Sequence, residues 1–149
     1  MRKVYVFSGL GVDRRVFQNI SFRNIDHEFV DWISPSSNEP IADYAKRIAE
    51  KLKAEKPILV GLSFGGMIAV EVSKIMDTET VILIASAKTK YELPKRYKIL
   101  SKLGIIKLLP SKVLKHHNFV TDWFFGVSSQ KDKRLLGQIL KETDSDFLK

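Results

Sequence analysis

The chain has 149 residues, of which 44% are hydrophobic and 28% charged, enough for one compact domain with a single core. It has no cysteine, which excludes disulfides and cysteine-based metal or redox sites, and its three histidines do not favour a metal site. No stretch is long and apolar enough to span a membrane. We therefore expect a cytoplasmic protein with no transmembrane segment and no metal or organic cofactor.

The net charge of +8 is unevenly distributed along the chain. Residues 1–85 hold 11 basic and 11 acidic side chains, whereas residues 86–149 hold 14 basic and 6 acidic ones. A lysine-rich, solvated helical surface is the simplest interpretation. An anionic substrate, an acidic lipid surface and nucleic acid are the alternatives. No nucleic-acid motif is present, so we expect no nucleic-acid partner.

Four short apolar runs in the first 87 residues predict buried strands, at residues 3–7, 27–33, 57–60 and 80–85. Helical patterns lie between them: a short helix capped by Asp13, an apolar stripe over residues 41–52, and an apolar run over residues 67–76. Such alternation predicts an α/β fold with a parallel sheet and helices on both faces. We predict the strand order second, first, third, fourth, written 2-1-3-4.

After residue 87 the strand pattern stops and helical patterns follow, near residues 93–103, 111–117 and 129–140. Ser129 and Asp132 resemble a capping box before the last of these helices. We therefore divide the chain into an α/β core, residues 1–87, and a helical cap-like segment, residues 88–149. Residues 143–146 resemble the start of a further helix, and a single turn is unstable alone. We expect the end to fray or the chain to be truncated.

A serine stands at the centre of the sequence GLSFG, residues 61–65, between the third predicted strand and a helix. The pattern G-x-S-x-G in that context is typical of a nucleophile elbow, a strained strand-to-helix turn. Gly61 and Gly65 would let the neighbouring backbone pass close to the turn. We predict that Ser63 is a nucleophile at the positive end of a helix. An ordinary glycine-rich turn is the alternative.

The sequence SGLG, residues 8–11, follows the first predicted strand. Acyl transfer builds negative charge on a carbonyl oxygen, which backbone N–H groups stabilise. The predicted donors are the N–H groups of Leu10 and Phe64. In the order 2-1-3-4 the chain reverses direction between the first and third strands, and open α/β sheets bind ligands at such a point. The two loops should therefore flank one site, although a plain glycine turn is the alternative for SGLG.

These segments resemble the α/β-hydrolases. The sequence FSGLGVDRRVF is similar to their oxyanion loop and first helix, with Ser8 where many members have histidine. The sequence PILVGLSFGGMIAVEVS is similar to their elbow and nucleophile helix, VILIASA to the strand that follows, and residues 88–149 loosely to their cap. The resemblance implies a serine hydrolase of carboxylic esters or thioesters that acts on a small acyl substrate.

The remainder of a catalytic triad departs from the family pattern. In the family the acid and the histidine follow later strands, which this sequence does not contain. Some members place the acid after the strand matched by VILIASA, but residues 86–88 hold no carboxylate and Glu92 is the nearest. His116 and His117 are candidate bases, with Asp122 as their orienting acid. We expect His27 to be an exposed loop residue.

Two alternatives follow from that departure. The chain could be a non-catalytic or truncated relative that binds a small acyl ligand but lacks the acid and the histidine. It could also be completed by a second copy, because the edge of the fourth strand would be exposed and prone to pairing. A homo-oligomer through this sheet edge is therefore a further expectation.

Overall fold

The computed structural model describes residues 2–89, 91–92 and 129–142. The chain divides into two compact units, Met1–Glu92 and Leu93–Lys149, and each is described by itself. The assignment of residues 88–149 as a cap stays a prediction, because most of that segment lies outside the described residues. The same holds for the helices expected near residues 93–103 and 111–117 and for the start of a helix at residues 143–146.

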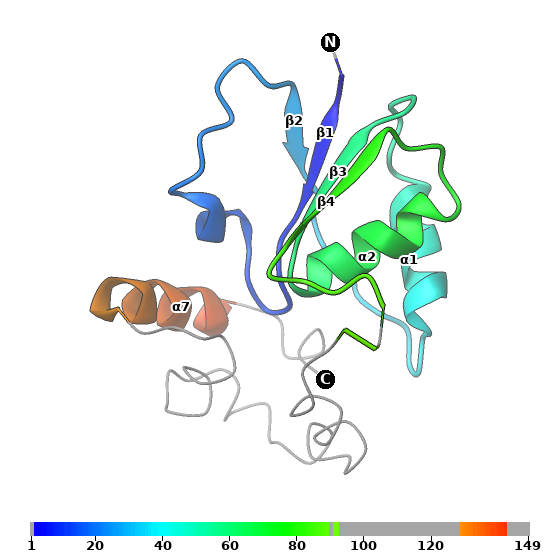
Figure 1. Cartoon of the computed structure of the whole chain (residues 1–149). Coiled ribbons are helices and arrows are strands. Elements are labelled where there is room, and N and C mark those ends of the chain that lie inside the picture. The colour runs from blue at the N-terminus through cyan, green and yellow to red at the C-terminus, as the bar shows by residue number, and fades with distance from the viewer. Residues whose placement is uncertain (1, 90, 93–128, 143–149) are drawn as a thin grey trace. The chain divides into compact units, whose positions relative to one another are not determined.

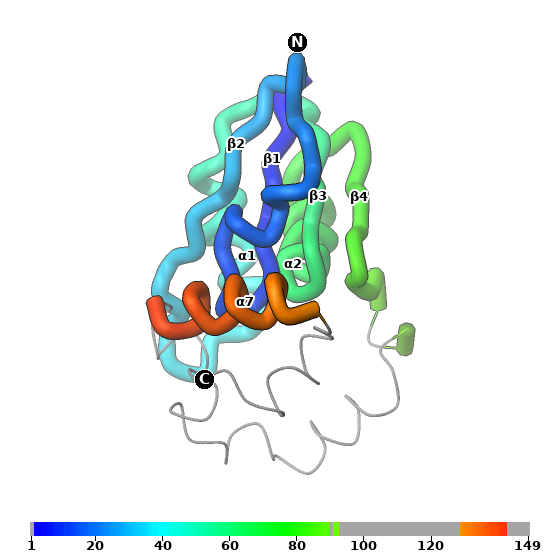
Figure 2. The backbone as a smooth tube through the Cα atoms, turned by 90° about the vertical axis from the view of Figure 1, so that its left-hand side faces the viewer, coloured from blue at the N-terminus to red at the C-terminus, as the bar shows by residue number. Residues whose placement is uncertain are grey.

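The first unit is built on a four-stranded parallel sheet, as the sequence predicts. Its strands are β1 (Val4–Phe7), β2 (His27–Phe29), β3 (Ile58–Leu62) and β4 (Thr80–Ile84). They lie in the order β2-β1-β3-β4, which Figure 2 shows. The predicted order is therefore confirmed. Val4 is opposite both His27 and Ile58, and Ile58 is opposite Thr80, so all four strands begin at one end of the sheet.

Helical segments cover both faces of this sheet (Figure 1). The helices α1 (Ile41–Ala49) and α2 (Phe64–Ser73) lie on one face and pack against each other. The 3-10 helix η1 (Arg14–Phe17) lies on the other face, where Phe17 packs against Val4, Val6 and Val60. Apolar burial on both faces explains why the strand sequences are almost continuously apolar.

Most element bounds differ by one to four residues from the predicted ones: β3 extends two residues further, to Leu62, and α1 ends three residues earlier, at Ala49. The differences at β2 and α2 matter most for the site. The strand β2 ends at Phe29 instead of residue 33; Phe29 is paired with Val6, one residue before the end of β1 at Phe7. One more backbone bond, from the Val30 N–H to the Val6 carbonyl oxygen, closes this pairing. The helix α2 begins at Phe64, three residues before the predicted start, because Gly65 and Gly66 are helical residues and not part of a loop.

In the second unit the structure describes α7 (Gln130–Glu142). One half of the predicted capping box is present: the Ser129 hydroxyl accepts a bond from the Asp132 N–H at 3.1 Å. The same hydroxyl donates to the Asp132 carboxylate at 2.6 Å. Leu136, Ile139 and Leu140 form the buried stripe of this helix. None of the helices that the structure describes is both long and apolar enough to cross a membrane.

Asp13 caps η1, as predicted, and its carboxylate also pairs with the guanidinium of Arg15 at 2.6 Å. The hydrogen bonds from Arg15 hold the pKa of Asp13 below its ordinary value. A depressed pKa in the folded state stabilises the protein above the unfolded pKa of about 4, and this contribution is lost as the pH falls through the folded pKa.

Replacing Asp13 by asparagine should therefore lower the melting temperature at neutral pH, and the difference from wild type should shrink as the pH falls below about 4. Thermal unfolding followed by circular dichroism over a pH series measures this. Asp31→Asn, at an exposed carboxylate, is the control and should show no such convergence. If the difference in melting temperature between Asp13→Asn and wild type stayed constant down to strongly acid pH, the Asp13–Arg15 interaction would not be the source of the stability.

Candidate active site

Ser63 joins the end of β3 to the start of α2 in a strained backbone conformation, with φ of 51° and ψ of −117°. Residues other than glycine rarely adopt positive φ, and such a conformation costs about 1–3 kcal/mol. A serine before a helix commonly caps it with its side chain, but the Ser63 hydroxyl makes no such bond to α2. The hydroxyl belongs to an exposed residue at the N-terminal end of a helix.

Hydrogen bonds to the Ser63 backbone from three directions hold this turn. The Ser63 N–H donates to the Ile84 carbonyl oxygen at 2.9 Å, so β4 holds one side of the residue. The Ser63 carbonyl oxygen accepts the Gly66 N–H at 3.0 Å, which starts α2, and the Ser86 hydroxyl at 2.6 Å. The strain at Ser63 is therefore maintained by bonds to β4, to Ser86 just beyond β4, and to the helix.

Glycines are required beside Ser63 because backbone fills the space where a side chain would stand. A Cβ on Gly61 would overlap the Cα of Gly66 and lie 2.5 Å from the carbonyl oxygen of Gly65. A Cβ on Gly65 would overlap the carbonyl oxygen of Ser8 and lie 2.6 Å from that of Phe7. Close approach of backbone, and not flexibility, thus explains the glycines at both positions.

The loop after β1 lies directly against this turn. Gly65 lies against the Ser8 backbone, because a Cβ placed on Gly65 would overlap the Ser8 carbonyl oxygen. A Cβ placed on Gly9 would lie 3.7 Å from the Cβ of Ser63. Leu10 is partly exposed between buried Gly9 and Gly11. The structure therefore brings the SGLG loop and the GLSFG turn together at the carboxyl ends of β1 and β3.

The contact between Ser86 and Ser63 cannot be predicted from the sequence, in which Ser86 is only a position without a carboxylate after the fourth strand. Ser86 follows Ala85, which has a φ of 45°, just beyond the end of β4. A Cβ on Gly66 would overlap the Ser86 hydroxyl and lie 2.5 Å from the Ser86 Cβ. No local pattern marks Ser86, because its role depends on residues more than twenty positions away.

This packing predicts an unusual rescue. Gly66→Ala should destabilise the protein by about 1–3 kcal/mol, because the new methyl group meets the Ser86 side chain. Ser86→Gly removes that side chain and should recover much of the loss in the double variant. Chemical unfolding of the two single variants and the double variant measures the coupling. Ser86→Ala, which keeps the Cβ, is the control and should rescue little; additive losses throughout would contradict the packing argument.

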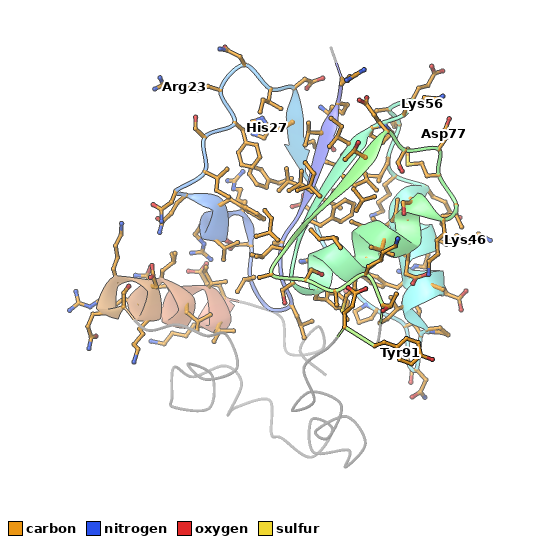
Figure 3. All side chains as sticks on the ribbon, viewed as in Figure 1. Arg23, His27, Lys46, Lys56, Asp77 and Tyr91 are labelled. Carbon is orange, nitrogen blue, oxygen red and sulfur yellow. The ribbon has the colours of Figure 1, made fainter. Side chains whose placement is uncertain are left out.

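Of the other residues singled out in the sequence, His27 lies at the opposite end of the sheet from Ser63. His27 is the half-buried first residue of β2, not an exposed loop residue as expected, because its ring stacks on Phe22 with centroids 4.8 Å apart. It lies at the amino-terminal end of the strands (Figure 3), in register with Ile58 through Val4. Five strand residues separate this level from Ser63, about 16 Å.

Glu92 serves a local turn in the described residues. Its carboxylate accepts the Lys88 N–H at 2.9 Å and the Thr89 hydroxyl at 3.3 Å. The candidate bases His116 and His117 and the acid Asp122 lie outside the described residues and stay predictions. Across residues 2–89, 91–92 and 129–142, no three His, Cys, Asp or Glu side chains are grouped so as to hold a metal ion.

The fold is that of the α/β-hydrolases. No protein-family model and no curated protein sequence matches the chain. Solved structures do: MenH from S. aureus (17% identity, TM-score 0.67), the esterase EaEST from Exiguobacterium antarcticum (16%, 0.61) and a hydrolase from Oleispira antarctica (15%, 0.62). Each alignment covers 99% of this chain and 63% of the other. The chain thus spans under two thirds of these proteins' length, and such low identities establish the shared fold alone.

Proposed function

We propose that this chain is the nucleophile-bearing part of a serine acyl hydrolase that cleaves carboxylic esters or thioesters at Ser63. The observation that carries the proposal is the positive φ of Ser63 between β3 and α2, held by Ile84, Ser86 and Gly66. Strained backbone conformations persist where the surroundings enforce them and are concentrated at active sites. The combination of strain and an exposed hydroxyl at a helix N-terminus favours a nucleophile over a plain turn.

In the proposed reaction the Ser63 oxygen attacks the substrate carbonyl carbon, and the hydroxyl proton passes to a base. The carbonyl oxygen becomes negatively charged and is stabilised by the N–H groups of Leu10 and Phe64. The alcohol or thiol then leaves with a proton, and water releases the acid from the acyl-serine. Phe64 is suited to this role as the first residue of α2, because helix N-terminal N–H groups point toward bound anions.

The identity of the base separates this proposal from its main rival. A serine without a base is a weak nucleophile, and the oxyanion donors alone give residual catalysis. His27, the one histidine among the described residues, lies at the far end of the sheet. This placement favours the second candidate function, a non-catalytic relative that binds a small acyl ligand, unless His116, His117 or a further chain supplies the base.

The deciding experiment is labelling with a fluorophosphonate probe, which reacts with activated serines. Wild type should be labelled and Ser63→Ala should not. Ser73→Ala is the matched control, because Ser73 lies at the other end of α2 and its hydroxyl bonds the Val70 carbonyl. Loss of labelling in His116→Asn or His117→Asn would then identify the base. A folded wild type that resists labelling would overturn the hydrolase and support the ligand-binding relative.

The sheet edge supports a proposal about assembly. Within the described residues β4 pairs with β3 alone, and Ile82 of β4 is 46% exposed. Strand edges of this kind pair readily with other chains. We propose a homo-oligomer through β4, which sedimentation of wild type and Ile82→Lys would test by a shift to monomer in the variant.

A further inference from the structure

A buried hydroxyl lies at the start of the loop beside Ser63. Ser8 is 5% exposed and is the one buried polar residue in the described part of the chain. A buried polar group is costly unless it is hydrogen-bonded. The Ser8 hydroxyl meets this requirement with two partners: it donates to the Val12 carbonyl oxygen at 2.7 Å and accepts from the Trp32 indole Nε1–H at 2.9 Å.

The direction of this hydrogen-bond chain is fixed by chemistry. An indole N–H can only donate and a carbonyl oxygen can only accept, so the hydroxyl must do both. The bond from Ser8 to Val12 closes the turn that contains Gly9, Leu10 and Gly11. The Trp32 indole, 24 residues away in the sequence, therefore donates to the same hydroxyl that closes this turn.

The same indole contacts the other proposed oxyanion donor. Its ring lies 5.7 Å from the ring of Phe64, at an angle of 50°, and 6.4 Å from that of Phe7. Aromatic pairs at such distances stabilise a defined arrangement. Trp32 thus bonds the turn that carries the Leu10 N–H and packs against the residue that carries the Phe64 N–H.

We propose that Trp32 is a positioning residue that sets the two backbone donors, Leu10 and Phe64, relative to each other through Ser8 and the Phe64 ring. The inference rests on the proposed function, since it assigns Trp32 to the oxyanion-binding step of that reaction. Errors of about 1 Å in such positioning lower reaction rates by about a hundredfold. The contacts that carry this assignment are to Ser8 and to the Phe64 ring, so Trp32 would act by positioning the backbone of these two segments.

The test compares Trp32→Phe with Tyr44→Phe. Trp32→Phe keeps a ring but removes the N–H that bonds Ser8. Tyr44→Phe loosens the same segment without touching Ser8, because the Tyr44 hydroxyl bonds the backbone of Ile33 at 2.8 and 3.2 Å. Two readouts are used: the rate of fluorophosphonate labelling against probe concentration, and amide hydrogen exchange of residues 9–12.

Trp32→Phe should lower the maximal labelling rate by about ten- to a hundredfold while the half-saturating probe concentration changes little. It should also speed exchange at residues 9–12, and Tyr44→Phe should do neither. Ser8→Ala should have a similar effect, and the double variant with Trp32→Phe should be little worse, because both substitutions break one hydrogen-bond chain.

The two readouts separate this inference from the proposed function. Exchange at residues 9–12 that is equal in Trp32→Phe and Tyr44→Phe overturns the inference whatever Ser63 does. Additive effects of Ser8→Ala and Trp32→Phe on labelling overturn it as well. A third outcome is that Trp32→Phe selectively speeds exchange at residues 9–12 while the wild type is never labelled. It would support the bond between Trp32 and the turn and would overturn the proposed hydrolase activity.

Discussion

Gly65→Ala should destabilise the protein by about 3 kcal/mol or more, or prevent it from folding. The sign of this effect is informative, because Gly65 lies within α2 and alanine normally stabilises a helix by about 1 kcal/mol relative to glycine. The new methyl group would overlap the Ser8 carbonyl oxygen and lie 2.6 Å from that of Phe7. Both obstacles are backbone at the end of β1, which no rotamer change can move. Denaturant unfolding measures the loss.

Gly9→Ala is the matched control on the facing loop. Its Cβ would lie 3.1 Å from a methyl group of Val12 and 3.7 Å from the nearest atoms of Leu62 and Ser63. A side chain can yield by a few tenths of an ångström, so we expect a change within about 1 kcal/mol. A stabilised Gly65→Ala would mean that the loop after β1 does not lie against α2. In that case the close approach of the two proposed donor segments would also be lost.

The fold could be predicted from the sequence because it follows from local patterns. Short apolar runs alternating with helical stripes predict the parallel sheet, and the switch between the first and third strands predicts where the two loops meet. The position of Ser63 follows from GLSFG between a strand and a helix. The structure agrees on the strand order and on the contact of the loops, through Gly65 against Ser8 and Gly9 against Ser63.

The remaining features depend on contacts between distant residues, which no local pattern encodes. The strand β2 ends at Phe29, although apolar residues continue beyond it in the sequence. Trp32 lies in the apolar segment that follows β2. The sequence pattern predicts a strand residue there, whereas in the structure its indole N–H bonds the Ser8 hydroxyl. Ser86 is equally ordinary in sequence, and its contact with Ser63 and Gly66 requires the β3–β4 pairing.

Ser63→Gly should remove labelling and at the same time stabilise the protein by about 1 kcal/mol. Glycine adopts positive φ without steric cost, which relieves strain of about 1–3 kcal/mol. The greater backbone entropy of glycine in the unfolded chain offsets about 0.5–1 kcal/mol of this gain. Ser63→Ala also lacks the hydroxyl but keeps a Cβ at a φ of 51°, so it should be no more stable than wild type. Unfolding free energies of the three proteins measure the strain directly.

The same substitutions at Ser73 provide the reference, because Ser73 lies in the regular helical backbone of α2. There, at the last helical residue, glycine should be less stable than alanine by up to about 1 kcal/mol, the reverse of the order expected at Ser63. If glycine is more stable than alanine at position 63 but less stable than alanine at position 73, the fold loses stability by holding Ser63 in its conformation. Proteins commonly retain such a loss where activity requires a strained residue. Equal stability of Ser63→Gly and Ser63→Ala would instead mean that the turn is relaxed, and the main argument for a nucleophile at this position would fail.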